Sequence, residues 1–214
     1  MKIALVGASG FIGSKILAEA ASRGHSVTAI CRHPEKIAPQ KGVHPVAADA
    51  YDTAALAEAI QGHDVVAHAC APPREMEMEP KIAAQTALTT SIIAAMKARG
   101  IPRILAVGGA GTLLVNDVRS MDRPDFPKQF EGGAKATAVI KELLQEENEF
   151  DWTVLCPSTM IVPGERTGKF RLDFDDLIVM ADGTSKISVE DFALAFVDEM
   201  EIPRYTGHRF TVGY

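Results

Sequence analysis

Short apolar runs alternate with stretches of helical periodicity along most of the 214-residue chain. The first run, residues 2–6, is predicted to be a strand. Residues 11–23 are predicted to be a helix, because apolar side chains recur every three or four positions until Gly24. The same reasoning predicts strands at 26–30, 43–47, 64–68, 103–107 and 152–156, and helices at 53–60 (capped by Thr53), 80–99 and 133–147.

Strands that alternate with helices indicate repeated βαβ units and therefore an α/β fold with a doubly wound parallel sheet. The predicted strands are apolar throughout, as expected when helices cover both faces of the sheet. After residue 157 the alternation ends in a loop with Pro163 and Gly164, a helix at 189–200 capped by Ser188, and a strand at 209–212. We predict one domain over residues 1–214, in which residues 157–214 contain a small substrate-side lobe packed over the sheet.

A glycine-rich turn, Gly7-Ala8-Ser9-Gly10-Phe11-Ile12-Gly13, joins the first strand to the first helix. Gly7 suits a tight turn, Gly10 lets the backbone approach a pyrophosphate, and Gly13 lets the helix pack closely on the sheet. The helix N-terminus offers free N–H groups to phosphate, and Ser9 adds a hydroxyl donor. The turn predicts a bound dinucleotide, the alternative being a tight turn without a ligand. Its G-x-x-G-x-x-G spacing is that of short-chain and extended dehydrogenases.

The second predicted strand runs into Cys31, Arg32 and His33, with no acidic residue. In NAD-preferring domains of this kind, an acid near this point accepts a hydrogen bond from the ribose 2′-OH. A guanidinium instead suits the 2′-phosphate of NADPH. We therefore predict that NADPH is preferred over NADH, with Arg32 at the 2′-phosphate and His33 and Lys36 adding positive potential. The alternative is that Arg32 lies over the adenine or points to solvent.

Three further segments follow predicted strands and are expected at the coenzyme. Asp49 is placed to bond the adenine amino group, or else serves a turn. The small residues from Ala69 to Pro73 permit the approach of a ribose. The glycines of Gly108-Gly109-Ala110-Gly111 suggest a flat ligand close to the backbone, or else an ordinary flexible turn.

The catalytic Tyr-x-x-x-Lys pair of short-chain dehydrogenases is missing from the helix after the fifth strand. Thr137 stands four positions before Lys141, and Glu131 four before Lys135. Lys135 is the lysine better placed to reach the cofactor, the alternative being that both lysines are surface residues. A threonine hydroxyl is far too weak an acid to replace tyrosine. The absence favours hydride transfer to a flat acceptor, which needs no strong acid, and leaves no catalytic residue assigned. The tyrosines stand elsewhere, at Tyr51, Tyr205 and Tyr214.

Composition and charge exclude several classes of function. A net charge of -6 without a long basic tract argues against direct nucleic-acid binding. The N-terminus does not have the pattern of a signal peptide, and no run approaches the roughly 20 apolar residues of a membrane span. The three cysteines form no Cys-x-x-Cys pair, which indicates reduced thiols and a cytoplasmic location. The six histidines show no paired spacing, so no metal is expected. We expect the protein to be a monomer or a homodimer.

Longer motifs across the chain resemble atypical short-chain dehydrogenases of the NmrA-like and NADH-flavin reductase group, which is related to biliverdin reductase B. The motifs include KIALVGASGFIGSKIL, RGHSVTAICRHPEKI, RILAVGGAGTL, FDWTVLCPS and PGERTGKFR. The resemblance implies a Rossmann domain that binds NADP(H), with the small lobe shaping an acceptor pocket. It departs from biliverdin reductase B at Ser158, where that relative has histidine, and at the GGAG glycines, where it has serine. Carried over by motif, the coenzyme residues are Gly7, Ser9, Gly10, Phe11 and Ile12 at the pyrophosphate, Arg32 at the 2′-phosphate, Asp49 and Ala50 at the adenine, and Cys70, Gly108 and Pro157 at the nicotinamide half.

Three functions remain open at this point. The leading one is an NAD(P)H-dependent oxidoreductase that reduces a small planar acceptor, either a flavin such as FMN or FAD or a quinone. The second is an NmrA-like redox sensor that binds the dinucleotide without turnover. The third, a nucleotide-sugar epimerase or dehydratase, is disfavoured by the missing tyrosine and the short chain.

Overall fold

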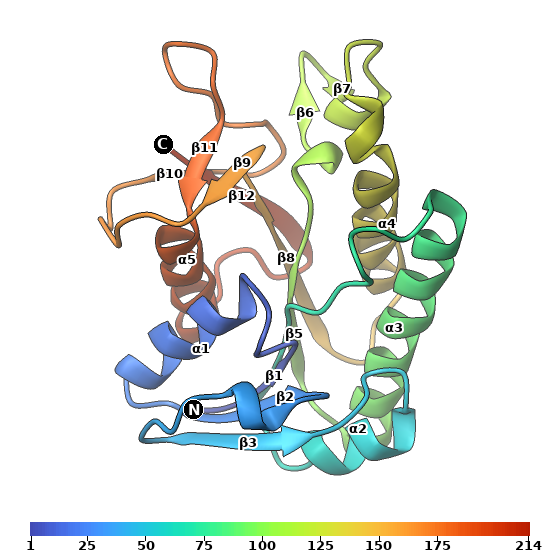
Figure 1. Cartoon of the computed structure of the whole chain (residues 1–214), viewed down its shortest axis with the longest axis vertical. Coiled ribbons are helices and arrows are strands. Elements are labelled where there is room, and N and C mark those ends of the chain that lie inside the picture. Colours follow the sequence, from blue (N-terminus) through green and yellow to red (C-terminus); the bar gives the residue numbers. More distant parts are fainter.

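The computed structural model describes all 214 residues and is built on an eight-stranded sheet (Figure 1). From one edge of the sheet to the other, the strands are β10 (Arg171–Asp173), β12 (His208–Gly213), β8 (Asp151–Pro157), β5 (Arg103–Val107), β4 (Val65–His68), β1 (Lys2–Val6), β2 (Ser26–Cys31) and β3 (Val43–Ala47). Strands β10 and β12 are antiparallel, and all other neighbouring strands are parallel.

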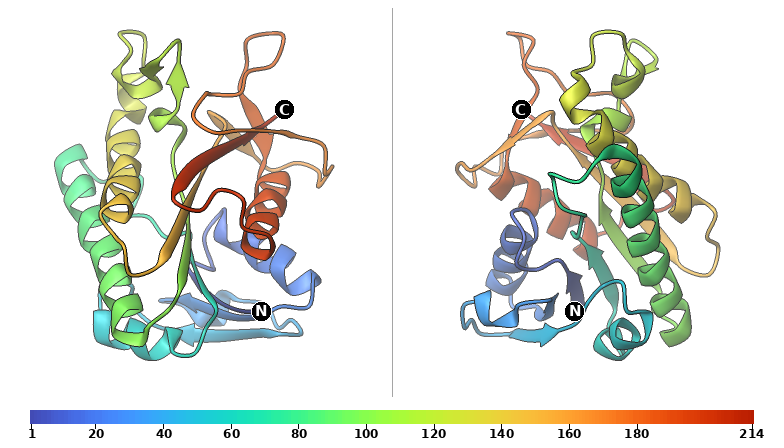
Figure 2. Two further views of the ribbon diagram at one scale, coloured as in Figure 1. Left: turned by 180° about the vertical axis from the view of Figure 1, so that it is seen from behind. Right: turned by 45° about the vertical axis from the view of Figure 1, so that its right-hand side comes forward.

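Helices cover both faces of this sheet. On one face lie α1 (Gly13–Ser22) and α5 (Val189–Glu201), and on the other lie α2 (Thr53–Ile60), α3 (Met78–Arg99) and α4 (Lys128–Gln145) (Figure 2). Within β1, Ile3 and Leu5 join the core beneath α1 and α5, whereas Ala4 and Val6 join the opposite core. Apolar residues on both sides of each strand thus build two cores, and the predicted doubly wound α/β fold is confirmed. Each helix is too short or too polar to serve as a membrane span.

The C-terminal third contributes both to the main sheet and to a smaller one. Helix α5 packs on the sheet, and β12 and β10 extend its edge, so much of this third belongs to the main body. Two small sheets stand beyond the C-terminal ends of the main strands (Figure 1). They pair β9 (Met160–Val162) with β11 (Lys186–Ser188), and β6 (Leu114–Val115) with β7 (Val118–Arg119).

The helix starts differ in part from the sequence predictions: α1 begins at Gly13 instead of residue 11, and α3 begins at Met78 instead of Pro80. The carboxylate of Asp52, not Thr53, caps α2, and it accepts from the N–H groups of Ala54 and Ala55 at 3.1 and 3.0 Å. Helix α4 was predicted to begin at Gly133, but it begins after Pro127 and runs through Gly132 and Gly133 to Gln145. The Ser188 cap of α5 is confirmed, since its hydroxyl accepts from the Asp191 N–H at 3.0 Å.

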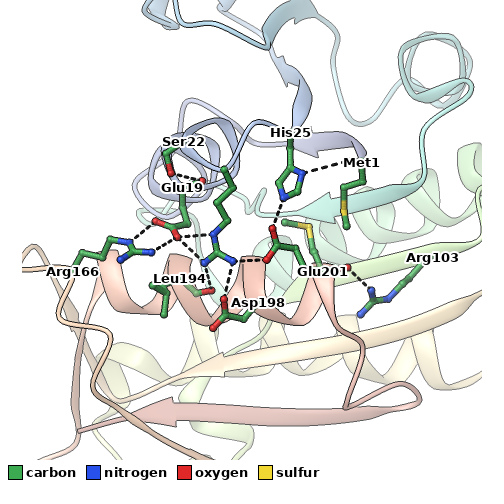
Figure 3. Close-up of polar contacts among 11 residues, drawn as sticks. Met1, Glu19, Ser22, His25, Arg103, Arg166, Leu194, Asp198 and Glu201 are labelled. Carbon is green, nitrogen blue, oxygen red and sulfur yellow. Dashed lines mark hydrogen bonds and ion pairs between the residues drawn. The ribbon is translucent and has the colours of Figure 1, made fainter.

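A cluster of ion pairs ties α1, α5 and the loop after β9 together (Figure 3). Glu19 on α1, only 7% exposed, accepts from Arg23 and from Arg166 of that loop. The Arg23 guanidinium continues to Asp198 and Glu201 of α5, at 2.8 and 2.7 Å. A buried carboxylate is therefore matched by two guanidinium groups, which fixes the loop to the helices.

Candidate coenzyme site

The chain reverses its direction across the sheet beside β1. It passes from β1 outward to β2 and β3, then returns to β4 on the opposite side of β1. In open α/β sheets, ligands bind at such a switch point, beyond the C-terminal ends of the strands. A cavity opens there, between the ends of β1, β2, β3 and β4. It is lined by Val6, Gly7, Ser9, Gly10, Ile30, Cys31, Arg32, Ala48, Asp49, Ala50, Tyr51, Ala69, Cys70, Ala71, Pro72, Pro73 and Leu88.

Most of the coenzyme residues expected from the sequence meet in this cavity. Phe11 and Ile12 follow in the same turn but do not line it. Gly108 and Pro157 lie at the ends of β5 and β8, farther along the sheet and also outside it. The predicted residues that line the cavity are Gly7, Ser9, Gly10, Arg32, Asp49, Ala50 and Cys70.

The glycine turn brings the chain into close contact with itself. Gly7 has φ +90°, and a Cβ there would lie 2.6 Å from the carbonyl oxygen of Ala69. A Cβ on Gly13 would lie 2.1 Å from the carbonyl oxygen of Gly7. These contacts confirm the predicted tight turn at Gly7 and the predicted close approach of the helix at Gly13.

Backbone donors remain free where α1 begins. The first bonds of this helical region are donated by Ser14 to Gly10 O at 2.9 Å and by Ile16 to Ile12 O at 3.1 Å. The preceding N–H groups, those of Phe11, Ile12 and Gly13, donate to no protein acceptor. Unpaired N–H groups and the helix dipole together make this end of α1 fit an anion such as a pyrophosphate.

Arg32 is an exposed cation on the cavity wall without an anionic partner. No hydrogen bond or ion pair joins its guanidinium to another side chain. The neighbouring His33 instead lies 3.2 Å from Glu35, so the acid offsets any charge that this histidine carries. Of the basic residues predicted here, Arg32 is therefore the one that lines the cavity without a direct ion pair, and Asp49 is the acid on the same cavity wall.

Asp49 has a turn role in the structure. Its Oδ1 accepts from the Tyr51 N–H at 3.1 Å, and its backbone carbonyl accepts from the Asp52 N–H at 2.9 Å. The turn places Tyr51 on the cavity wall, where burial, followed by Cys70 and Asp49, raises the pKa of its phenol. Burial also raises the pKa of the Cys70 thiol, which therefore stays protonated at neutral pH.

A buried polar chain that sequence reasoning missed supports the segment after β4. The Cys70 N–H donates to His68 Nδ1 at 3.4 Å, and His68 Nε2 lies 3.5 Å from the Thr89 hydroxyl on α3. Gln85 donates to the same hydroxyl at 3.1 Å. Burial lowers the pKa of His68 to about 4, so the ring is neutral at neutral pH. The polar pair Gln85 and Thr89, four apart on one helix, was the available signal.

The glycines after β5 lie in close contact with the neighbouring strand β8 and helix α4. A Cβ on Gly108 would lie 2.6 Å from both Cys156 Sγ and Val154 Cγ1, and one on Gly111 would lie 2.6 Å from Ala134 Cβ. Packing alone thus accounts for these glycines, and the interpretation that they lie beside a flat ligand stays a prediction. Contacts with β8 and α4 already require them.

The lysines of α4 are engaged along the helix surface. Lys135 Nζ lies 2.5 Å from Glu131 Oε1, and Lys141 Nζ lies 3.1 Å from Gln145 Oε1. The expectation that Lys135 reaches toward the cofactor therefore gains no support, because Glu131 holds its ammonium group. No three His, Cys, Asp or Glu side chains converge into a group that could hold a metal ion.

Known proteins share this sequence pattern and this fold. Residues 7–200 match the family model described as NAD(P)H-binding. A solved structure from Burkholderia pseudomallei, named as a candidate exported protein, is 41% identical with a TM-score of 0.89, and 100% of each chain is covered. A candidate epimerase from Bacteroides thetaiotaomicron is 40% identical with a TM-score of 0.90, covering 100% of this chain and 96% of the other. A candidate NADH-flavin reductase from Streptococcus pneumoniae TIGR4 is 29% identical with a TM-score of 0.86, covering 100% and 99%.

Proposed function

The chain belongs to the NAD(P)H-binding family, among the atypical short-chain dehydrogenases of NmrA-like type, and on that premise we propose that it is an NADPH-dependent reductase of a planar acceptor. One observation carries the proposal. One cavity at the switch point of the sheet is lined by the unpartnered Arg32 and by Ser9 and Gly10, the residues that directly precede the unpaired backbone donors at the start of α1.

The described residues fit a phosphorylated dinucleotide in their donor chemistry. The N–H groups of Phe11, Ile12 and Gly13 would hold the pyrophosphate, and Arg32 would hold the 2′-phosphate. The segment from Ala69 to Pro73, with small or ring-constrained side chains, would pass the ribose. A bound nicotinamide supplies the hydride, whereas the protein positions it and its acceptor.

The acceptor is inferred from what the neighbouring side chains lack. Neither residue that stands four positions before Lys135 or Lys141 is a tyrosine: one is Glu131, and the other is Thr137, whose hydroxyl donates to the carbonyl oxygens of Gly133 and Ala134 within α4. Without a strong acid there, reduction of a flavin or quinone is favoured over reduction of a simple ketone. The name of the Streptococcus pneumoniae relative agrees with a flavin. We further place the protein in the cytoplasm because its cysteines are unpaired, although the name of the Burkholderia relative points to export.

The test combines coenzyme binding with turnover. Calorimetry should detect binding of NADPH, and NADPH oxidation should be seen with FMN, riboflavin or a quinone. Gly10→Ala is a suitable variant, because an added Cβ would meet only Gly7 O, at 3.3 Å, and Gly10 lines the cavity. We expect it to fold normally and to bind NADPH about tenfold more weakly. Folded wild-type protein that binds neither NADPH nor NADP⁺ would exclude the proposal.

The second candidate function is a dinucleotide sensor without turnover. It is favoured by the same observation, since Thr137 and Lys135 are both engaged within α4. The experiment above separates the two functions. Tight binding of NADPH without oxidation in the presence of any flavin or quinone would select the sensor.

A further inference from the structure

We propose that the ring of Tyr51 forms the wall on which the adenine base of the coenzyme packs. The inference rests on the proposed coenzyme site and assigns a residue that no motif in the chain had indicated. Tyr51 follows β3 and lines the same cavity as Arg32, Asp49 and Cys70. Its position sets the nucleobase end of the site, opposite the glycine turn.

The backbone of Tyr51 is held before any ligand arrives. Asp49 Oδ1 accepts from the Tyr51 N–H at 3.1 Å, and Asp52 donates its own N–H to the carbonyl oxygen of Asp49 at 2.9 Å. Asp52 then caps α2 through Ala54 and Ala55. These hydrogen bonds hold the turn in one conformation. The ring therefore projects from a preorganised turn and needs little ordering when a base packs on it.

The ring itself is available to a ligand. Tyr51 is 46% exposed although it lies in a cavity, and its phenol oxygen has no hydrogen-bond partner in the protein. Arg32, Asp49 and Cys70 all lie close enough to perturb the pKa of this phenol, so the ring stands among the groups expected at the adenosine. A half-exposed aromatic face in such a place suits a flat purine, since bases stack on aromatic side chains.

This assignment separates two kinds of recognition within one cavity. A wall for the base contributes equally to every adenine coenzyme, whether or not the ribose carries a 2′-phosphate. Arg32, in contrast, responds to the phosphate. Tyr51 should therefore affect affinity, and Arg32 should affect the choice between NADPH and NADH.

Binding of coenzyme fragments tests the inference without any catalytic readout. Calorimetry would compare 2′,5′-ADP, 5′-AMP and nicotinamide mononucleotide with wild type, Tyr51→Ala, Tyr51→Leu and Tyr51→Phe. For Tyr51→Ala we expect both adenine ligands to bind at least about fivefold more weakly, the lower end of what a lost base-stacking contact costs. Tyr51→Leu should lose less, and Tyr51→Phe should bind like the wild type. Nicotinamide mononucleotide, which lacks adenine, should be unaffected by all three.

Other outcomes overturn the inference. Wild-type affinity of Tyr51→Ala for both adenine ligands would show that the ring contributes nothing. A loss seen only for 2′,5′-ADP, and already present in Tyr51→Phe, would mean that the hydroxyl contacts the phosphate instead. If the wild type binds NADPH but neither adenine fragment, the inference fails and the coenzyme site stands. If it binds no nucleotide at all, both fail. Circular dichroism and urea unfolding would verify that each variant is folded.

Discussion

The side chain of Thr137 fills the space beside Gly109, where a Cβ would come within 2.2 Å of the Thr137 hydroxyl oxygen. Thr137 lies on α4, and Gly109 lies in the turn after β5. Thr137, which stands four positions before Lys141, therefore packs the helix against this turn. A side chain at position 109 would not fit beside the Thr137 hydroxyl.

Gly109→Ala is expected to destabilise the protein. The new methyl group would overlap the Thr137 Oγ1 at 2.2 Å and its Cβ at 2.9 Å, so α4 or the turn must move. Overpacking of this kind costs about 1–3 kcal/mol. Urea unfolding followed by circular dichroism measures the loss, and a second substitution, Thr137→Ala, should recover part of it.

Gly133→Ala serves as the matched control for that substitution. Gly133 lies within α4, and nothing is within 4 Å of the place where its Cβ would stand. Alanine should be neutral there or stabilise the helix by up to about 1 kcal/mol. Equal unfolding free energies for Gly109→Ala and wild type would contradict the packing explanation.

The sequence predicted those features that short segments determine by themselves. Strands such as β1 and β5 are apolar runs bounded by turn residues, and the start of α5 is marked by Ser188. The glycines at 7 and 13 were also interpreted correctly, because a strand, a turn and a helix follow within a few residues. In these cases local signals and tertiary structure agree.

The predictions of helix starts and caps fail where contacts or conformations outside the local segment determine the structure. Adjacent Asp52 and Thr53 are both good caps, and only the backbone conformation selects the aspartate. Gly132 lies outside the predicted helix, yet α4 includes it, and a Cβ there would lie 3.3 Å from Met78 of α3. A glycine that serves a ligand and one that serves a neighbouring helix look the same in the sequence.

The buried His68 should make stability depend on pH. Burial lowers its pKa from an ordinary 6.5 to about 4. Above pH 6.5 the ring is neutral in both states; below it, the unfolded chain binds a proton that the folded chain refuses. The free energy of unfolding should fall as pH falls from 6.5 to 4, by roughly 3 kcal/mol from this residue.

Urea unfolding between about pH 7 and pH 4.5 tests this expectation. His68→Gln retains an acceptor for the Cys70 N–H but does not titrate, so its stability should fall less steeply than that of the wild type. His44→Gln, at an exposed position, is the control and should keep the wild-type slope. Parallel pH curves for wild type and His68→Gln would show that the ring is not buried as described.

Glu19 should also make the free energy of unfolding depend on pH, in a lower pH range than His68. The hydrogen bond from Arg166, followed by that from Arg23, lowers the pKa of its carboxyl below the ordinary 4.5, although burial opposes the shift. A folded-state pKa below the unfolded one gives stability that is present above pH 4.5 and is lost as pH falls through the folded value. At neutral pH, Glu19→Gln should therefore cost about 2 kcal/mol.

The effect of Glu19→Gln should shrink as pH falls through the lowered folded-state pKa of Glu19, where the wild-type carboxyl also becomes protonated. Glu131→Gln is the matched control, because Glu131 pairs with Lys135 on an exposed helix surface. Such pairs contribute about 0.5 kcal/mol or less. If both substitutions cost the same at neutral pH, the cluster in Figure 3 would contribute no more than an ordinary surface pair.

Arg32 is expected to select between the two nicotinamide coenzymes. Its guanidinium stands on the cavity wall without a protein partner, so no ion pair must break when a phosphate binds. Arg32→Ala should weaken NADPH binding by about 1–3 kcal/mol, the range for a lost charge-assisted hydrogen bond. NADH binding should change much less, because NADH has no 2′-phosphate. Arg32→Lys keeps the charge but loses the fork of donors, and it should fall between the two.

The control must remove the same charge outside the cavity. Lys36 lies in the short turn after β2, is exposed, and does not line the cavity, so Lys36→Ala changes the net charge as Arg32→Ala does. Calorimetric titration of all variants with NADPH and NADH, at two salt concentrations, separates contact from general attraction. A loss for Lys36→Ala as large as that for Arg32→Ala would reduce the role of Arg32 to its charge. Unchanged NADPH affinity in Arg32→Ala would remove this residue from the coenzyme site, because a bound 2′-phosphate could not then depend on it.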